Sequence, residues 1–191
     1  MSTIAENLID MRTRLATAAA GANRALSDAS TNTSVADGSL NSRTVAAIPN
    51  LFAVETVDGA KKADTLQKAL VQAQRPNPLN VFVQVNTSGE ESKGGVEPPE
   101  CVAVAKHIIE KCPNLKLFGL MTIGSWDHSH AEGTNPDFQR LVECGNLIKA
   151  ETGIALELSM GMSDDFELAI AMGATNVRLG SCIFGARAKK V

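Results

Sequence analysis

The chain has 191 residues, of which 44% are hydrophobic and 20% charged, and its formal net charge is −3. This composition is typical of one globular domain that is long enough to bury a sizeable core. No stretch is dense in lysine and arginine and no apolar run approaches the roughly 20 residues that cross a bilayer, so we expect neither a nucleic-acid partner nor a membrane span.

The N-terminal unit, residues 1–26, is predicted to be an amphipathic helix, because Ile4, Leu8, Met11 and Leu15 recur at helical spacing. Its acidic side chains distinguish it from a secretory signal and from an acid-poor transit peptide. The protein is therefore expected in the cytoplasm.

Residues 27–43 are rich in Ser, Thr, Asn, Asp and Gly, a composition that predicts a linker. Residues 44–191 then alternate short apolar segments with helical ones, which favours parallel strands joined by helices in an α/β domain. About five βα units are recognisable, whereas a closed (β/α)8 barrel has eight. The predicted strands are 51–57, 80–86, 116–123, 155–161 and 176–180, and the predicted helices are 60–74, 98–112, 136–151 and 164–172.

The cysteines and histidines carry only weak signals. None of the four cysteines is in a C-x-x-C pair, so we expect reduced and partly buried thiols. His128 and His130 have a spacing that would suit a metal on a strand, but the segment SWDHSHAEGTNPD around them is more typical of a solvated loop. We therefore predict no metal site.

Gly and hydroxyl residues follow the predicted strands, where parallel α/β folds collect their functional groups. The last two strand ends read SMGMS (159–163) and RLGS (178–181). Glycine lets backbone N–H groups approach a phosphate and serine adds a donor, so these ends predict an anion site. The alternative is that they are ordinary turns that cap the next helix.

Arg178 stands in the otherwise apolar last segment, where a buried guanidinium needs a partner. Two interpretations remain open. Arg178 forms a structural ion pair with Glu157 or Asp165, or it contacts an acceptor on a ligand.

Four segments, NLFAVETVD, FVQVNTSGEESKGG, GLMTIGS and LSMGMSDDFELAIAMGATNVRLGSCIFGAR, resemble the pyridoxal phosphate homeostasis protein family, relatives of the alanine racemase barrel. The resemblance covers residues 44–187. It implies an α/β fold of the (β/α)8 TIM-barrel class with pyridoxal 5'-phosphate in the barrel mouth, and it implies that Arg178 faces the pyridine nitrogen. The implied phosphate-binding residues are Ser159, Gly161, Ser163, Gly180 and Ser181.

The chain departs from the family before residue 44. The family's Ser-Lys-Thr-Lys-type motif, whose first lysine forms the Schiff base, is absent, as are the two segments that mark the next strands. The resemblance therefore implies an incomplete barrel without strands one to three, in a shortened form that arises by splicing or from a gene-model error. Lys61, Lys62 and Lys93 are expected to be solvated and not to replace the missing lysine.

The missing strands have consequences for packing. The segments 51–57 and 176–180 are expected to be open sheet edges, through which copies of the chain would self-associate. Interior-facing side chains are expected to lose their packing partners; those predicted to face the interior are Val83, Val85, Leu117 and Met121.

The resemblance implies a non-catalytic protein of intracellular pyridoxal phosphate homeostasis, with binding impaired and non-covalent because the lysine is absent. One alternative is an interaction protein or degenerate fragment that binds no ligand. Another is a racemase- or decarboxylase-like enzyme, which would require the lysine and an opposed acid–base residue such as tyrosine. The chain has no tyrosine, and we predict no catalytic residue.

Overall fold

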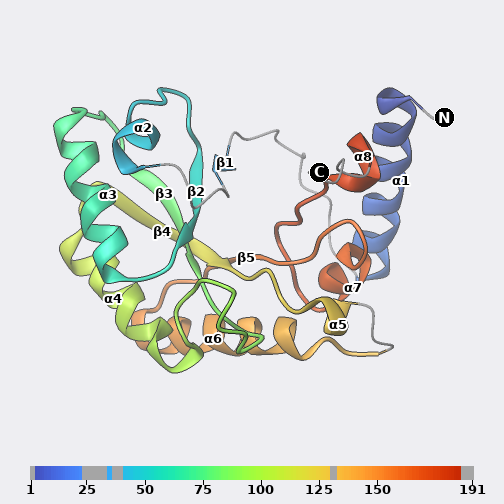
Figure 1. Ribbon diagram of the computed structural model, residues 1–191. Coiled ribbons are helices and arrows are strands. Elements are labelled where there is room, and N and C mark those ends of the chain that lie inside the picture. Colours follow the sequence, from blue (N-terminus) through green and yellow to red (C-terminus); the bar gives the residue numbers. More distant parts are fainter. Residues whose placement is uncertain (1–2, 23–33, 36–40, 130–132, 186–191) are drawn as a thin grey trace.

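A parallel sheet forms the centre of the computed structural model, which describes residues 3–22, 34–35, 41–129 and 133–185 (Figure 1). The spatial order of the strands, β1-β2-β3-β4-β5, follows the chain order, and every pairing is parallel. The predicted α/β class is confirmed. The strands are β1 (Ser34–Val35), β2 (Ala53–Val57), β3 (Leu79–Gln84), β4 (Leu115–Met121) and β5 (Glu157–Ser159).

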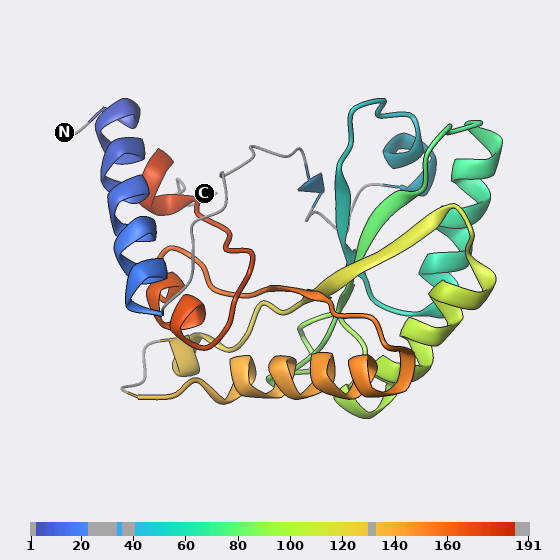
Figure 2. The same ribbon diagram turned by 180° about the vertical axis from the view of Figure 1, so that it is seen from behind.

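Helices cover the sheet on one side, and a second group of helices lies beyond β5 (Figures 1 and 2). The helices predicted at 60–74, 98–112, 136–151 and 164–172 are all present, with small shifts of their ends. None of the described helices is long and apolar enough to span a membrane. The helices are α1 (Ile4–Gly21), α2 (Ser42–Ala46), α3 (Ala60–Gln72), α4 (Cys101–Lys111) after a 3-10 turn (Pro98–Glu100), α5 (Trp126–Ser129), α6 (Pro136–Thr152), α7 (Phe166–Ala171) and α8 (Ser181–Phe184).

The longest helices have the caps that their sequences provide. Thr3 and Glu6 form a capping box at the start of α1, so two otherwise unpaired backbone N–H groups are satisfied. Asn135 caps α6, and Gly153 ends it with φ 74°. These local signals explain why the predicted boundaries of α6 are close to the observed ones, whereas α1 occupies only part of the predicted 1–26.

The main core lies between the sheet and helices α3, α4 and α6. Val83, Val85 and Leu117 belong to this core, so the prediction that they face the barrel interior is wrong. In β3 an error of one residue in the assignment reverses the face. In β4 the pairing with β3 shifts by one residue after Leu117, so Leu117 and Met121 face opposite sides. Met121, the fourth predicted residue, does lie on the other face, beside Ala53, Phe82, Phe52 and Phe118.

The helix α1 packs against α7 and α8 and not against the sheet (Figure 2). Met11 lies in one small core with Phe166 and Ile183. The guanidinium of Arg14 lies 4.8 Å from the centre of the Phe166 ring and pairs with Glu167. The N-terminal helix is therefore fixed to the C-terminal part of the chain, while the boundaries 1–26, 27–43 and 44–191 stay predictions.

Neither of the segments predicted to be an open sheet edge, 51–57 and 176–180, is a fully open strand in the structure. Most of 27–43 lies outside the described residues, but Ser34 and Val35 pair with Ala53 and Val54 and cover the start of β2. The predicted strand 176–180 is wrong: only Asn176 forms a bridge, to Ser159. The segment leaves the sheet because β5 ends at Ser159, and the apolar side chains that follow pack in the core shared with α1.

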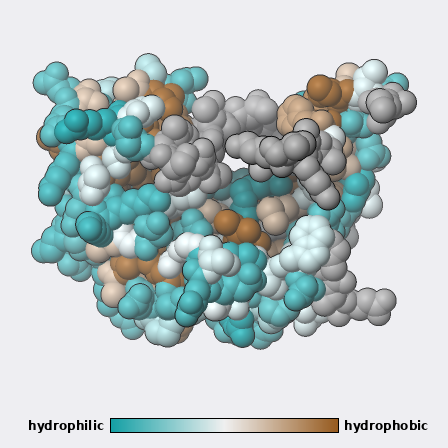
Figure 3. All heavy atoms as spheres, viewed as in Figure 1, coloured by the Kyte–Doolittle hydropathy of each residue, from teal (hydrophilic) through white to brown (hydrophobic). Residues whose placement is uncertain are grey.

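We expect the chain to self-associate through the outer edge of β2, because among the described residues only Ser34 and Val35 pair with that edge. Apolar atoms are also visible in the recessed middle of the face shown in Figure 3. Light scattering after gel filtration should show species larger than the monomer that grow with concentration, together with a broad thermal transition. A monodisperse monomer that melts sharply would contradict this prediction.

Candidate functional site

The two turns that the sequence marks as an anion site lie side by side. The carbonyl of Gly161 accepts a hydrogen bond from the backbone N–H of Arg178 at 3.0 Å. The hydroxyl of Ser163 accepts from the N–H of Gly180 at 3.2 Å and from that of Cys182 at 3.4 Å. We call the segments 159–165 and 178–182 the paired turns.

The second turn already binds one oxygen atom, the side-chain oxygen of Ser163. Two backbone N–H groups from the second turn, those of Gly180 and Cys182, converge on its side-chain oxygen. Gly180 and Ser181 are exposed and Cys182 is partly exposed, so the second turn lies at the surface. Backbone N–H groups that converge on one oxygen acceptor are the arrangement that binds phosphate oxygens.

Gly161 is required by packing in the first turn. Its φ is +91°, in the region that favours glycine. A Cβ at this position would lie 2.5 Å from the Cβ of Ala169 and 3.1 Å from the Cα of Phe166, both in α7. The glycine therefore allows the first turn to rest directly on α7.

Ser159 and Arg178, the other two predicted residues, belong to a polar network behind the paired turns. Arg178 donates from Nη1 to Ser159 Oγ and from Nη2 to the carbonyl of Thr122, both at 2.7 Å. Ser159 Oγ donates to Glu55 Oε2 at 3.0 Å, and both Ser159 and Glu55 are buried. Through Arg178 the network connects the side chain of Glu55 in the middle of β2, the carbonyl of Thr122 just after β4, and the side chain of Ser159 at the end of β5.

The carboxylates that act on Arg178 are those of Glu55 and Asp165, whereas the sequence suggested Glu157 or Asp165. Burial lowers the pKa of its guanidinium, and the carboxylates of Glu55 and Asp165 oppose that shift. Glu157, one of the two expected partners, makes no contribution to this shift. Asp165 contributes charge, but its Oδ1 accepts from the backbone N–H of Met162 at 2.7 Å. Sequence reasoning missed Glu55, although an acidic residue within an apolar strand was a signal.

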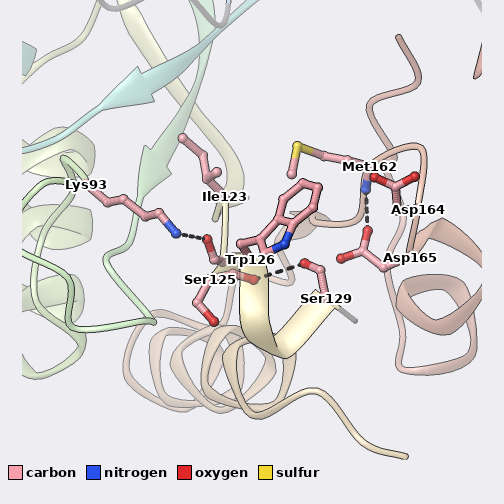
Figure 4. A pocket seen from close by; sticks show the side chains of 9 residues that line it. Lys93, Ile123, Ser125, Trp126, Ser129, Met162, Asp164 and Asp165 are labelled. Carbon is pink, nitrogen blue, oxygen red and sulfur yellow. Dashed lines mark hydrogen bonds between the residues drawn. The ribbon is translucent and has the colours of Figure 1, made fainter. Parts of the chain in front are cut away.

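A pocket of about 240 Å³ lies beside the paired turns, at the carboxyl ends of β4 and β5 (Figure 4). Lys93 reaches it from the loop after β3 and donates to the carbonyl of Gly124 at 2.5 Å and to Glu90 at 2.8 Å. Its side chain is 24% exposed, so the expectation of a freely solvated lysine is wrong here. The lining residues are Lys93, Ile123, Gly124, Ser125, Trp126, Ser129, Met162, Asp164 and Asp165.

The polar segment around His128 is partly helical, so the predicted loop is wrong at 126–129. Asp137, fully buried in the first turn of α6, accepts from the N–H of Ser125 at 2.7 Å and pairs with His128 Nδ1 at 2.9 Å. This carboxylate fixes the short helix, and no local sequence pattern indicates the pairing. His130 lies outside the described residues.

Comparisons with known proteins cover most of the chain. Residues 3–188 match the family model of the alanine racemase N-terminal domain. The chain is 51% identical over 144 residues to the human pyridoxal phosphate homeostasis protein, a match that covers 74% of this chain and 52% of the relative. The protein of the same name from Schizosaccharomyces pombe is 47% identical over 153 residues, 78% of this chain and 63% of the relative. The chain thus spans about half the length of the human relative.

Solved structures show the same fold. An unknown protein from Bifidobacterium adolescentis is similar with a TM-score of 0.68 and 34% identity, over 80% of this chain and 60% of that chain. PipY from Synechococcus elongatus, in a structure with PLP bound, has a TM-score of 0.64 and 22% identity, over 81% of this chain and 70% of that chain. The second likeness shows the fold alone.

Proposed function

The chain belongs to the alanine racemase N-terminal domain family, among the pyridoxal phosphate homeostasis proteins, and from this premise we propose that it binds pyridoxal 5'-phosphate without a covalent bond. The observation that carries the proposal is the convergence of the Gly180 and Cys182 N–H groups on the Ser163 oxygen. Its cellular role is then to hold this cofactor. Its four cysteines are free thiols, as is usual in the cytosol, where we place this role.

The residues present fit the phosphate part of this cofactor. Ser163, Gly180 and Ser181 would bind the phosphate, with Gly161 holding the first turn in place. Arg178, held from behind by Ser159, would direct its charge toward the pyridine nitrogen. The bound cofactor supplies an aldehyde that reacts with amines, but the family's lysine motif does not occur in the chain.

We propose that the protein is not an enzyme. Racemase or decarboxylase chemistry on this cofactor needs a positioned acid–base residue opposite the lysine, commonly a tyrosine, and the chain has none. The second candidate, a fragment that binds no ligand, rests on the absence of the lysine motif. A binding measurement distinguishes the two.

Ser181→Asp should abolish binding of inorganic phosphate and of pyridoxal 5'-phosphate, because it places a negative charge beside the N–H groups of Gly180 and Cys182. The fold should survive, since Ser181 is exposed and an acidic residue is favourable at the start of a helix. Calorimetry of the wild type, Ser181→Asp and the neutral control Ser181→Asn tests this. Unchanged affinity in Ser181→Asp would refute the site, and a wild type that binds neither probe would favour the ligand-free fragment.

We expect borohydride treatment of the protein with pyridoxal 5'-phosphate to label no single lysine stoichiometrically. Lys61 is exposed, Lys62 pairs with Asp58 at 3.3 Å, and Lys93 is held by Glu90 and Gly124. Peptide mapping by mass spectrometry reports the labelled positions. Complete labelling of Lys93 would show that this lysine replaces the missing one.

A further inference from the structure

Three side chains with metal-binding atoms meet between α3 and α4, away from the paired turns. Asp64 lies in the second turn of α3, His107 lies in α4, and Cys112 is the residue that ends α4. Their ligand atoms all lie within 4.8 Å of one another. His107 Nε2 is 2.7 Å from Asp64 Oδ1, and Cys112 Sγ is 3.8 Å from the same oxygen.

The backbone around these residues is held in place by other contacts. The side chain of Gln67, three residues after Asp64, donates to Asn114 Oδ1 and accepts from the Asn114 N–H, both at 2.8 Å. This reciprocal pair fixes the end of α4 to α3. Cys112 leaves the helix with φ −121° and ψ 71°, its N–H donates to the carbonyl of Ile108, and it is buried.

We propose that Asp64, His107 and Cys112 bind a zinc ion that joins α3 to α4. A thiolate, an imidazole and a carboxylate are the ligands that zinc takes in proteins. Tetrahedral zinc with bonds of about 2.0 Å to N and O and about 2.3 Å to S holds its ligand atoms roughly 3.3–3.6 Å apart. The separations from Asp64 Oδ1, 2.7 Å to His107 Nε2 and 3.8 Å to Cys112 Sγ, lie on either side of these values, and all three ligand atoms lie within 4.8 Å of one another. Movements of about 1 Å therefore bring them to the geometry of a zinc site.

Solvent access agrees with the site, and because burial and the Asp64 carboxylate raise the pKa of the Cys112 thiol to about 11, the zinc ion has to displace its proton. The side chain of Asp64 is 46% exposed and that of His107 is 28% exposed, so an ion can enter from solvent and keep water as a fourth ligand. The carboxylate is the ligand that has to move away from His107, and its exposure leaves it free to rotate. When the metal binds, the thiol of Cys112 gives its proton to the buffer.

Two measurements on the untagged full chain test the proposal: isothermal titration calorimetry with Zn²⁺, and thermal unfolding with and without Zn²⁺. We expect one zinc per chain and a higher melting temperature with zinc, because the ion binds the folded state. Removing a residue that only hydrogen-bonds to a metal ligand weakens metal binding by about 10- to 100-fold. Loss of a ligand itself should weaken zinc binding by at least about tenfold, in each of the variants Asp64→Asn, His107→Gln and Cys112→Ser. Co²⁺ in place of zinc should show a thiolate-to-metal charge-transfer band that Cys112→Ser removes.

Matched controls separate this site from other ligands. His128→Gln alters the other histidine–aspartate pair, and Cys182→Ser removes a more accessible thiol. Both should leave the affinity and the Co²⁺ band unchanged. If Cys112→Ser fails to fold by circular dichroism, Asp64→Asn decides, because its carboxylate is half exposed. Full zinc affinity in Asp64→Asn, or a Co²⁺ spectrum without the thiolate band, would overturn the proposal.

Discussion

Gly161→Ala should lower the free energy of unfolding by several kcal/mol. The residue has φ +91°, a conformation that costs an alanine about 1–2 kcal/mol. The added methyl group would also lie 2.5 Å from the Ala169 Cβ, and overpacking of this kind costs about 1–3 kcal/mol. Urea unfolding of the variant and the wild type measures the sum. Phosphate binding should be lost together with stability, because the first of the paired turns can no longer rest on α7.

Gly173→Ala is the matched control, because it removes the glycine on the other side of α7. Gly173 has φ +105°, but a Cβ there meets no atom within 4 Å. It should therefore cost only the backbone strain, about 1–2 kcal/mol, and leave phosphate binding intact. Equal losses in the two variants would show that the contact with α7 contributes nothing.

Most of the architecture can be predicted from the sequence because its signals are local. Helix α6 begins at an asparagine cap followed by proline and ends at glycine, and β3 and β4 lie within apolar segments flanked by turn residues. The segment 176–180 has the same apolar character but forms no strand. A segment forms a strand only where an adjacent strand can pair with it, and β5, the strand beside 176–180, has only three residues.

The candidate site is predictable only in part, because some of its contacts join residues that are far apart along the chain. The glycines and serines of the paired turns can be identified because each turn follows an apolar segment that the sequence predicts to be a strand, although the segment before Gly180 forms none. The partners of Arg178 cannot, since Glu55 and Thr122 are 123 and 56 residues away along the chain and meet it only when the sheet forms. The contact of Asp64 with His107 spans 43 residues and is likewise invisible in any local pattern.

Arg178→Met should destabilise the protein by about 3–5 kcal/mol, the usual cost of leaving a buried charge without its partner. The variant removes the donor to Ser159 Oγ and the positive charge near Glu55, a residue that is 5% exposed. Methionine keeps most of the length of the side chain, so the loss reports charge and hydrogen bonding more than volume. Urea unfolding measures the change in free energy.

A double-mutant cycle with Glu55→Gln separates the charge from the rest of the network. Glutamine keeps an oxygen that accepts from Ser159 Oγ but carries no charge that needs Arg178. If the penalty of Arg178→Met comes from the uncompensated carboxylate, adding Glu55→Gln to that variant should recover a large part of the lost stability. Arg178→Lys should lie between the wild type and Arg178→Met, because an ammonium group cannot reach both Ser159 Oγ and the Thr122 carbonyl in the fork geometry of the guanidinium. If the two substitutions instead add independently, the hydrogen bond to Thr122 and the packing of the side chain account for the stabilisation, and the charge of Glu55 does not.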